Sequence, residues 1–301
     1  MQDESINIIS NLSIMSISAT KPLIIGHRGN PGNPLNSLNI ENTERSFQSA
    51  WDVGVDGVEF DVELSKDGVL FVHHDDNFGR VFVAPDKSKK KLVSSYTWDA
   101  ISRAKLNVKG LKKNVGEVHV ANINGQAGAT IPRLEEIPVS SNGLLFLEIK
   151  LPKDIEPQSQ REAEYLDELV RLTVKSLEEN KLIDRTVILS FVASALAKAK
   201  LHNLNLKTAF NIYQHEAEGD NFDEFLRTAK RDFGIDAVNP PFEQTSKTSI
   251  TTAHDLGLFI CPWVWNEPAL QEIAEIKRLL SIGVDGVITN QPGEAVLNRY
   301  N

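Results

Sequence analysis

The amino-acid sequence predicts an α/β fold, a TIM-type (β/α)8 barrel with an insertion after the second strand and its hairpin. Three observations favour this architecture. From residue 143 onward, strand-like runs alternate with helical runs, which indicates a parallel sheet. About eight strands remain when the return arm of the hairpin is set aside, and eight strands close a barrel. No Gly-rich nucleotide loop follows the first strand, which disfavours an open doubly wound sheet.

The first predicted strand covers residues 22–26 and ends at His27, Arg28 and Gly29. Active sites of α/β barrels form where the carboxyl ends of the strands meet, so we expect His27 and Arg28 at this mouth. Taken alone, His27 is better explained as an ordinary loop histidine. A helix follows the loop, and Glu41 before it either orients the loop above the site or only lies near the positive end of that helix.

Residues 58–76, VEFDVELSKDGVLFVHHDD, form a predicted hairpin around which the site is organised. Glu59 and Asp61 lie two positions apart, so a strand places both carboxylates on one face. The Asp-Gly pair at 67–68 predicts a two-residue turn, because glycine accepts the positive φ that the turn requires. Such a turn sets His74 opposite Asp61 and on the face of both carboxylates. A plain surface hairpin with polar side chains in water is the alternative interpretation.

Residues 79–130 are predicted to be an insertion within the barrel, without a core of its own. The segment contains a lysine-rich run at 87–91, which is typical of a solvated loop and less often of a contact with an anionic surface. A short helical pattern covers 98–104. Residues 1–20 lack the basic start and apolar block of a secretory signal, and we expect a poorly ordered N-terminal extension there. One barrel domain is therefore expected over residues 21–301.

The remaining strands and helices are predicted from apolar patterning. Buried apolar runs such as LLFLEIKL and TVILSF indicate strands, and apolar residues that recur every three or four positions indicate helices. Strands are predicted at 144–151, 186–191, 207–212, 237–239, 258–265 and 285–290. Helices are predicted around residue 47, at 161–180, after residue 191, at 221–232, up to about 254, and at 268–282.

Three carboxylates converge on the predicted mouth, those of Glu59, Asp61 and Glu148. Left alone they would repel one another and their pKa values would rise, and a bound divalent cation relieves this repulsion. Oxygen ligands favour magnesium or calcium over zinc or copper. We therefore expect one divalent cation, magnesium or calcium, as the cofactor.

Two cations and two histidines complete the predicted site. Arg28 and Lys150 supply fixed positive charge that suits a phosphate whose charge builds up in the transition state. His27 and His74 supply groups for proton transfer to and from the reacting oxygens. A buried salt bridge between Glu148 and Lys150 is the structural alternative for that pair.

Composition narrows the classes of partner. The formal net charge of −9 argues against a nucleic-acid-binding protein, which would usually carry a basic face. The single cysteine, Cys261, excludes an internal disulfide. No apolar run is long enough for a stable insertion into a membrane. These features favour a small-molecule substrate and a cytoplasmic location, and they do not indicate an oligomeric state.

The motifs taken together resemble those of the glycerophosphodiester phosphodiesterases. The matching pieces run in the order of the family and span nearly everything after residue 20. They are GHRG at 26–29, ENT at 41–43, GVEFDVELSKDGVLFVHHDD at 57–76, IPRLEE at 131–136, LEIK at 147–150, SF at 190–191, WVWN at 263–266 and GVDGVITNQP at 283–292. Asn290 departs from this resemblance, because the family usually has Asp there.

The resemblance implies a TIM-type barrel that hydrolyses glycerophosphodiesters to glycerol 3-phosphate and an alcohol with a divalent metal. It implies His27 and His74 as the acid/base pair, Glu59, Asp61 and Glu148 as metal ligands, Arg28 and Lys150 as phosphate ligands, and Trp263 in the substrate cleft. Two alternatives remain. One is phospholipase-D-like hydrolysis of lysophospholipids, suggested by Phe78, Val81 and Phe82, and the other is a barrel that binds phosphodiesters without catalysis.

Overall fold

The computed structural model describes residues 21–31, 39–88, 91–112, 126, 128–213, 222–264 and 269–299. The expectation for residues 1–20 lies outside this part of the chain, as does that for 113–125 of the predicted insertion. None of the helices in the described ranges is long and apolar enough to cross a lipid bilayer.

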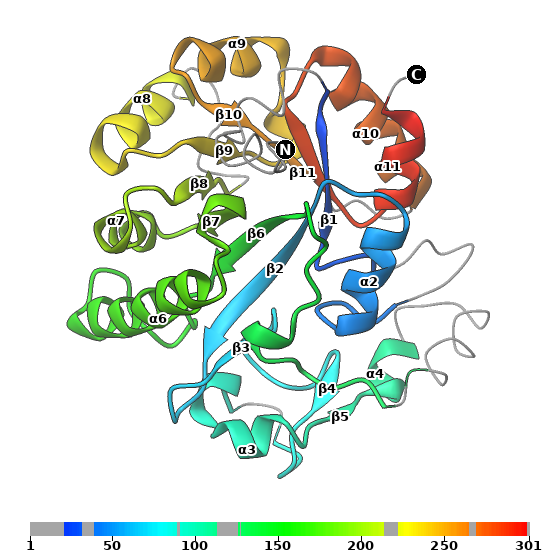
Figure 1. Cartoon of the computed structure of the whole chain (residues 1–301), viewed down its shortest axis with the longest axis vertical. Coiled ribbons are helices and arrows are strands. Elements are labelled where there is room, and N and C mark those ends of the chain that lie inside the picture. The colour runs from blue at the N-terminus through cyan, green and yellow to red at the C-terminus, as the bar shows by residue number, and fades with distance from the viewer. Residues whose placement is uncertain are drawn as a thin grey trace, which may run out of the picture.

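A parallel β-sheet curls into a barrel at the centre of the molecule (Figure 1). Its strands follow one another around the sheet in the order β10-β9-β8-β7-β6-β2-β1-β12-β11. They are β1 (Leu23–His27), β2 (Gly57–Leu64), β6 (Leu144–Ile149), β7 (Thr186–Ser190), β8 (Lys207–Asn211), β9 (Ala237–Asn239), β10 (Phe259–Ile260), β11 (Trp263–Val264) and β12 (Gly286–Thr289).

The barrel closes through one chain segment that is split into β10 and β11. β10 pairs with β9 and β11 pairs with β12, and only Cys261 and Pro262 lie between them. The Cys261 N–H donates to the Val238 carbonyl (3.0 Å), and the Pro262 carbonyl accepts from the Ile288 N–H (3.0 Å). The segment 259–264 therefore acts as one strand between β9 and β12. With it, the described strands make the eight-stranded ring that the sequence predicts.

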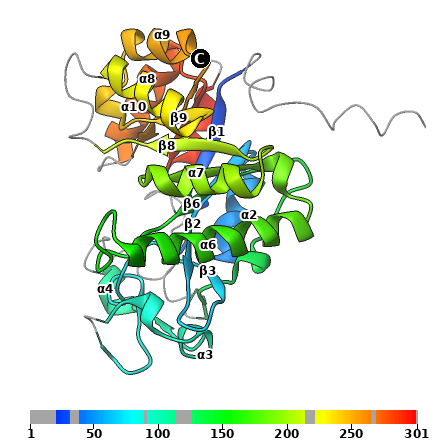
Figure 2. The same cartoon turned by 90° about the vertical axis from the view of Figure 1, so that its left-hand side faces the viewer.

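Helices cover the outside of the barrel (Figure 2). In the described ranges, a helix follows every barrel strand except β2, after which the chain enters the hairpin and the insertion. The helices are α2 (Glu44–Asp52), α6 (Gln160–Glu179), α7 (Ala193–His202), α8 (Phe222–Phe233), α9 (Lys247–Asp255), α10 (Ala269–Ile282) and α11 (Pro292–Asn298). Short 3-10 turns lie at Val93–Ser95, Leu134–Glu136, Ile183–Arg185 and Phe242–Gln244.

Alternation along the strands separates two apolar layers. On β1, Leu23 and Ile25 belong to a cluster inside the barrel, whereas Ile24 belongs to the larger cluster between strands and helices. On β6, Leu144 and Phe146 face inward, and the intervening residues face the helices. Side chains at the next inward positions of each strand therefore stand above the inner apolar cluster, at the mouth.

The predicted register of the hairpin is wrong by one residue. Ser65, not Lys66, pairs with Val69, because the turn holds three residues and Gly68 takes a φ of 80° as the third of them. The return strand β3 (Leu70–Val72) pairs antiparallel with β2 and leaves His73 opposite Asp61, whose carbonyl accepts from the His73 N–H (3.0 Å). His74 therefore reaches the mouth from the loop after β3, not from a strand face.

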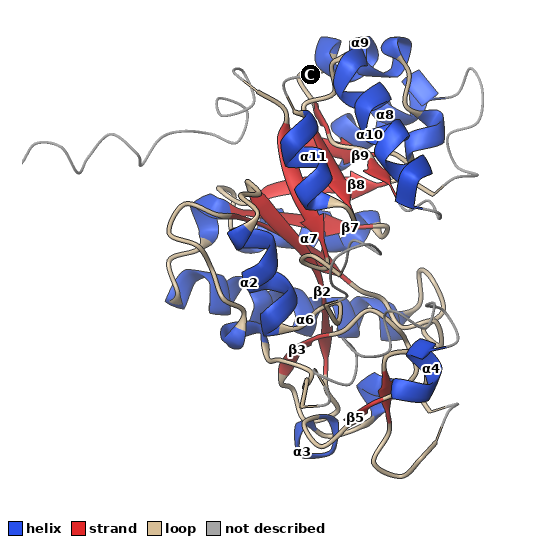
Figure 3. Cartoon of the chain, turned by 90° about the vertical axis from the view of Figure 1, so that its right-hand side faces the viewer, coloured by secondary structure: helices blue, strands red, loops and turns tan. Residues whose placement is uncertain are grey.

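The insertion after the hairpin packs on an apolar cluster that it shares with residues outside 79–130, such as Ile40, Phe71 and Ile131. It contains β4 (Phe82–Val83), β5 (Lys105–Leu106), α3 (Trp98–Ile101) and α4 (Val108–Lys112), which lie together beyond the far end of β2 (Figure 3). Twelve buried side chains form this cluster, hereafter the insertion core: Ile40, Phe71, Phe78, Val81, Phe82, Ala84, Val93, Tyr96, Ile101, Ala104, Leu106 and Ile131. The apolar residues are scattered between glycines and lysines, which hides this core from periodicity.

Candidate active site

The polar side chains at the mouth continue the inward-facing columns of the barrel strands. His27 follows Leu23 and Ile25 on β1, and Glu148 follows Leu144 and Phe146 on β6. Glu59 and Asp61 occupy alternate positions on β2 between residues that face the helices. The sequence periodicity that fills the barrel with apolar side chains thus also aims these groups at one point.

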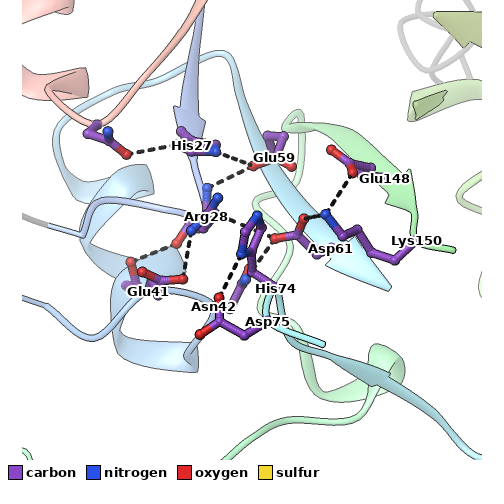
Figure 4. Close-up of polar contacts among 12 residues, drawn as sticks. His27, Arg28, Glu41, Asn42, Glu59, Asp61, His74, Asp75, Glu148 and Lys150 are labelled. Carbon is purple, nitrogen blue, oxygen red and sulfur yellow. Dashed lines mark hydrogen bonds and ion pairs between the residues drawn. The ribbon is translucent and has the colours of Figure 1, made fainter. Parts of the chain in front are cut away.

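Three carboxylates meet there, as the sequence predicts. One oxygen each of Glu59, Asp61 and Glu148 lies within 4.8 Å of the others, and all three residues are buried. Figure 4 shows the group, with Glu59 and Asp61 on one strand and Glu148 on its neighbour. Burial and the charges of Asp61 and Glu148 raise the pKa of Glu59 well above its usual value. The repulsion among these carboxylates fits a divalent cation, and the all-oxygen set suits a hard one.

Two cationic side chains border the carboxylates. Lys150 Nζ lies 3.1 Å from Glu148 Oε1 and 3.6 Å from Asp61 Oδ1, and Arg28 Nε lies 3.6 Å from Asp61 Oδ2. Burial alone would raise the pKa of Asp61, but His74, Lys150 and Arg28 outweigh it and hold that pKa below its usual range. For Glu59 the charge of Arg28 does not outweigh burial and the neighbouring carboxylates; Glu59 accepts from the Arg28 backbone N–H (3.0 Å) and lies 3.8 Å from His27 Nε2.

His27 is held by a neutral partner from the last strand. Its Nδ1 lies 2.8 Å from Oδ1 of Asn290, just beyond β12. An amide oxygen accepts, so Nδ1 carries the proton and Nε2 presents its lone pair toward Glu59. Burial, then the charge of Arg28, lowers the pKa of His27 to about 3.

His74 is held by an acidic partner next to it in the chain. Its Nδ1 lies 2.9 Å from Oδ1 of Asp75. Because a carboxylate only accepts, this contact again places the proton on Nδ1 and leaves Nε2 as the free ring nitrogen. His73 points elsewhere: it is buried against Phe78 and Phe82, with ring centroids 6.1 and 6.0 Å away.

A cavity of about 890 Å³ opens above these groups. Seven of the eight predicted site residues line it: His27, Arg28, Glu59, His74, Glu148, Lys150 and Trp263. Asp61, the eighth, is 1% exposed, and one of its carboxylate oxygens lies within 4.8 Å of those of Glu59 and Glu148. The structure therefore brings the whole predicted set together.

Several residues at the mouth escaped the sequence analysis. Arg80 lies at the start of the insertion and bridges Glu41 and Asp75. Asn42 donates from Nδ2 to Asp61 Oδ2 (2.9 Å). Asn211 donates to Glu148 Oε2 (3.1 Å) and accepts from Asn239 (2.8 Å). A signal existed for the two strand asparagines, since Asn239 ends one predicted strand and Asn211 is the penultimate residue of another, but none existed for Arg80.

Comparison with known proteins identifies the family. The model of the Glycerophosphoryl diester phosphodiesterase family matches residues 27–294. The chain belongs to this family. As a member of the glycerophosphoryl diester phosphodiesterase family it is a phosphoric diester hydrolase, and the buried acidic triad matches the need of this family for a divalent metal.

Individual relatives agree with membership of the glycerophosphoryl diester phosphodiesterase family. A glycerophosphodiester phosphodiesterase of Bacillus altitudinis is 27% identical over 84% of this chain and 90% of its own length. One from Caldanaerobacter subterraneus is 25% identical over 92% and 97%. A phosphodiesterase of Oleispira antarctica, solved with sn-glycerol-3-phosphate, shares the fold with a TM-score of 0.70 at 21% identity, over 95% of this chain and 99% of that one.

Proposed function

We propose that this protein hydrolyses glycerophosphodiesters to glycerol 3-phosphate and an alcohol, with His27 and His74 as the acid/base pair. The observation that carries the proposal is the convergence of two histidines, two cations and three carboxylates on one cavity. Binding alone does not require two groups whose ring nitrogens are both arranged for proton transfer. The same product is bound to the Oleispira antarctica phosphodiesterase of similar fold.

Glu59, Asp61 and Glu148 are proposed to hold one divalent cation, magnesium or calcium. When bound, such an ion polarises a phosphoryl oxygen and stabilises the negative charge of the transition state. Arg28 and Lys150 bind the remaining phosphate oxygens from the edge of the same carboxylate group. Trp263 on β11 forms an apolar part of the cavity wall for the organic part of the substrate.

The two histidines are proposed to move protons at their Nε2 atoms. Asn290 and Asp75 hold the Nδ1 protons, so each ring keeps one nitrogen for the reacting oxygens. One ring takes a proton from the attacking water as its oxygen bonds to phosphorus, and the other protonates the leaving alcohol oxygen as the bond between that oxygen and phosphorus breaks. The neighbouring cations Arg28 and Lys150 orient the phosphate between the two rings.

The three apolar side chains that suggested lysophospholipids as substrates are largely buried. Phe78, Val81 and Phe82 are at most 3% exposed and belong to the insertion core, and of the three only Phe78 lines the cavity. Deacylated diesters are therefore the first substrates to test.

The decisive experiment measures glycerol 3-phosphate release from glycerophosphocholine, -ethanolamine, -inositol and -glycerol. We expect release that a chelator abolishes and that Mg²⁺ or Ca²⁺ restores. His27→Ala should lose the activity, whereas His202→Ala, an exposed histidine at the end of α7, should keep it. No release from any diester with either metal would refute the proposal. Tight binding of a diester without turnover would then support a binding protein.

A further inference from the structure

Arg80 connects the insertion to the active site through two bidentate ion pairs. Its Nε and Nη2 atoms lie 2.8 and 2.9 Å from the two oxygens of Asp75, and its Nη1 and Nη2 atoms each lie 2.6 Å from an oxygen of Glu41. All three guanidinium nitrogens are thus engaged. An exposed ion pair contributes little, but the side chains of Glu41 and Asp75 are only 16% and 19% exposed. The planar, bidentate geometry also fixes the orientation of the guanidinium group relative to both carboxylates.

Each of the two carboxylates also accepts a hydrogen bond from a residue of the proposed reaction. Glu41 Oε1 accepts from Arg28 Nη1 (2.9 Å), and Arg28 is the proposed phosphate ligand. Asp75 Oδ1 accepts from His74 Nδ1 (2.9 Å), and His74 is one of the proposed proton-transfer groups. One guanidinium therefore lies at the centre of a chain that runs from Arg28 through Glu41, Arg80 and Asp75 to His74.

The backbone around Arg28 needs such support. Arg28 and Asn42 both take a φ of 55°, a conformation that is rare for residues other than glycine, and the Asn42 N–H donates to the Arg28 carbonyl (3.1 Å). Conformations of this kind persist only where the surroundings over-determine them. Glu41 precedes Asn42 and is held by Arg80, so the ion pair fixes the loop as well as the Arg28 side chain.

The insertion core in turn fixes Arg80. Phe78, Val81 and Phe82 flank Arg80 and are buried in that core, and the Gly79 N–H donates to the Phe82 carbonyl (2.7 Å). The guanidinium therefore projects from a rigid turn into the cavity, which it helps to line.

We propose that Arg80 is a positioning residue, by which the insertion orients Arg28 and His74 through Glu41 and Asp75. Arg80 does not itself touch the reacting atoms in this role. The inference rests on the proposed function, because its effect is read in the rate of that reaction. It gives the insertion a part in the chemistry of the barrel in addition to any part in substrate choice.

The test is chemical rescue of Arg80→Ala. We expect kcat to fall about 100-fold, the loss typical of a misplaced catalytic group, while the folded signal in circular dichroism is kept. Millimolar guanidinium should then restore a saturable part of the rate, because the vacated space opens into the cavity. Methylammonium should restore none, since a point charge cannot bridge two carboxylates. Arg103→Ala removes an exposed pair with Asp99 in the same insertion, and it should neither lose activity nor respond to guanidinium.

Two further variants test separately the contact of Arg80 with Asp75 and its contact with Glu41. Asp75→Asn should lower kcat with little change in KM, because it acts on His74. Glu41→Gln should raise KM, because it acts on the phosphate ligand Arg28. Adding Arg80→Ala to either variant should cost less than it does in the wild type, because part of its effect is already lost.

The outcomes separate this inference from the proposed function. Wild-type protein that releases no glycerol 3-phosphate refutes the proposed function itself. Active wild type with a fully active Arg80→Ala, or with an Arg80→Ala loss that guanidinium leaves unchanged, refutes only the positioning role. If Arg80→Ala fails to fold, Arg80→Lys carries the test: a rate near that of wild type overturns the bidentate role, and a large loss with a folded spectrum supports it.

Discussion

The Oδ1 atom of Asn290 lies 2.8 Å from Nδ1 of His27, so the last strand of the barrel orients a side chain of the first. The acceptor is neutral, and its own backbone is fixed because the Asn290 N–H donates to Glu272 Oε1 (2.8 Å). Glu272 also accepts from the Thr289 hydroxyl (2.6 Å) and is 1% exposed. The orientation of His27 therefore depends on a buried contact between α10 and the end of β12.

Removal of the Asn290 acceptor should lower kcat. Asn290→Leu leaves His27 free to rotate and to change tautomer, and we expect a loss of about 10-fold to 100-fold with little change in KM. Asn290→Asp keeps an acceptor and should retain more activity than Asn290→Leu. Steady-state kinetics of both variants, with the exposed Asn205→Leu as control, check this. Equal rates for Asn290→Leu and wild type would contradict it.

Asn211 should influence metal affinity. It donates to Glu148 Oε2 and is itself held by Asn239, so it orients one of the three proposed ligands. We expect Asn211→Ala to weaken binding of Mg²⁺ or Ca²⁺ by about 10-fold. Calorimetric titration of the metal into protein without substrate measures this directly. Glu59→Gln should weaken binding further, and Glu224→Gln, an exposed position on α8, should leave it unchanged.

The stability of the fold should decline below neutral pH because of His73. Burial lowers the pKa of His73 to about 4, and Nε2 has no hydrogen-bond partner among the described residues. The unfolded chain takes up a proton near the ordinary pKa of about 6.5, whereas the folded chain resists it. Stability is therefore fully kept above about 6.5 and lost as the pH falls toward 4, with a limiting slope of about 1.4 kcal/mol per pH unit.

Urea unfolding at pH 7.5 and pH 5 checks this slope. In His73→Phe the free energy of unfolding should change less between the two pH values than in wild type. The aromatic neighbours Phe78 and Phe82 make phenylalanine a suitable replacement. An equal pH dependence in both proteins would show that His73 is not the group involved.

Gly29 should tolerate no side chain. A Cβ atom there would lie 2.6 Å from Ser46 Oγ and 2.7 Å from the Ser46 carbonyl carbon, and the φ of 89° already disfavours other residues. We expect Gly29→Ala to destabilise the fold by about 2 kcal/mol or more, through a clash added to backbone strain. Gly54 is the matched control, because it has a φ of 84° with open space around it. Gly54→Ala should lower the free energy of unfolding by only about 1 kcal/mol. Equal midpoints of urea unfolding for the two variants would contradict a clash at Gly29.

The barrel and the insertion should unfold together as one domain. Phe71 lies on β3, which pairs with β2 of the barrel, yet its side chain belongs to the insertion core. Loss of either unit therefore exposes the other. Scanning calorimetry should show one transition whose calorimetric and van't Hoff enthalpies agree. Two resolved transitions would argue for separate domains.

The sequence predicted the site residues well, because the active site of an α/β barrel forms at the carboxyl ends of its strands and these ends can be located from the sequence. Glu148 follows inward-facing apolar positions, and Glu59 and Asp61 alternate with apolar residues that face the helices, so the alternation that identifies a strand also tells which side chains face the mouth. Trp263 was predicted only through the resemblance to a known family. The strand that contains it is split by Pro262, and apolar patterning across 258–265 shows one continuous run.

Features that depend on contacts between distant loops could not be predicted. The hairpin register changed because Asp-Gly suits both a two-residue turn and the three-residue turn that forms, and only the pairing distinguishes them. Arg80 gave no signal, because its partners lie 5 and 39 residues earlier in the chain, outside regular elements. The insertion core escaped detection for the same reason: its members have no common period.

Strand β12 pairs with β1, and the residues in contact at the mouth, His27 and Asn290, are 263 positions apart. The site is therefore complete only after β12 has paired with β1 and closed the barrel. This pairing joins residues that are far apart in the sequence, so it orders a very long stretch of chain during folding. A chain emerging from the ribosome would present all three carboxylates and both histidines long before it could orient His27. Enzymatic activity consequently reports completed folding. Loss of the pairing between β1 and β12 would abolish activity even if most of the helices stayed in place.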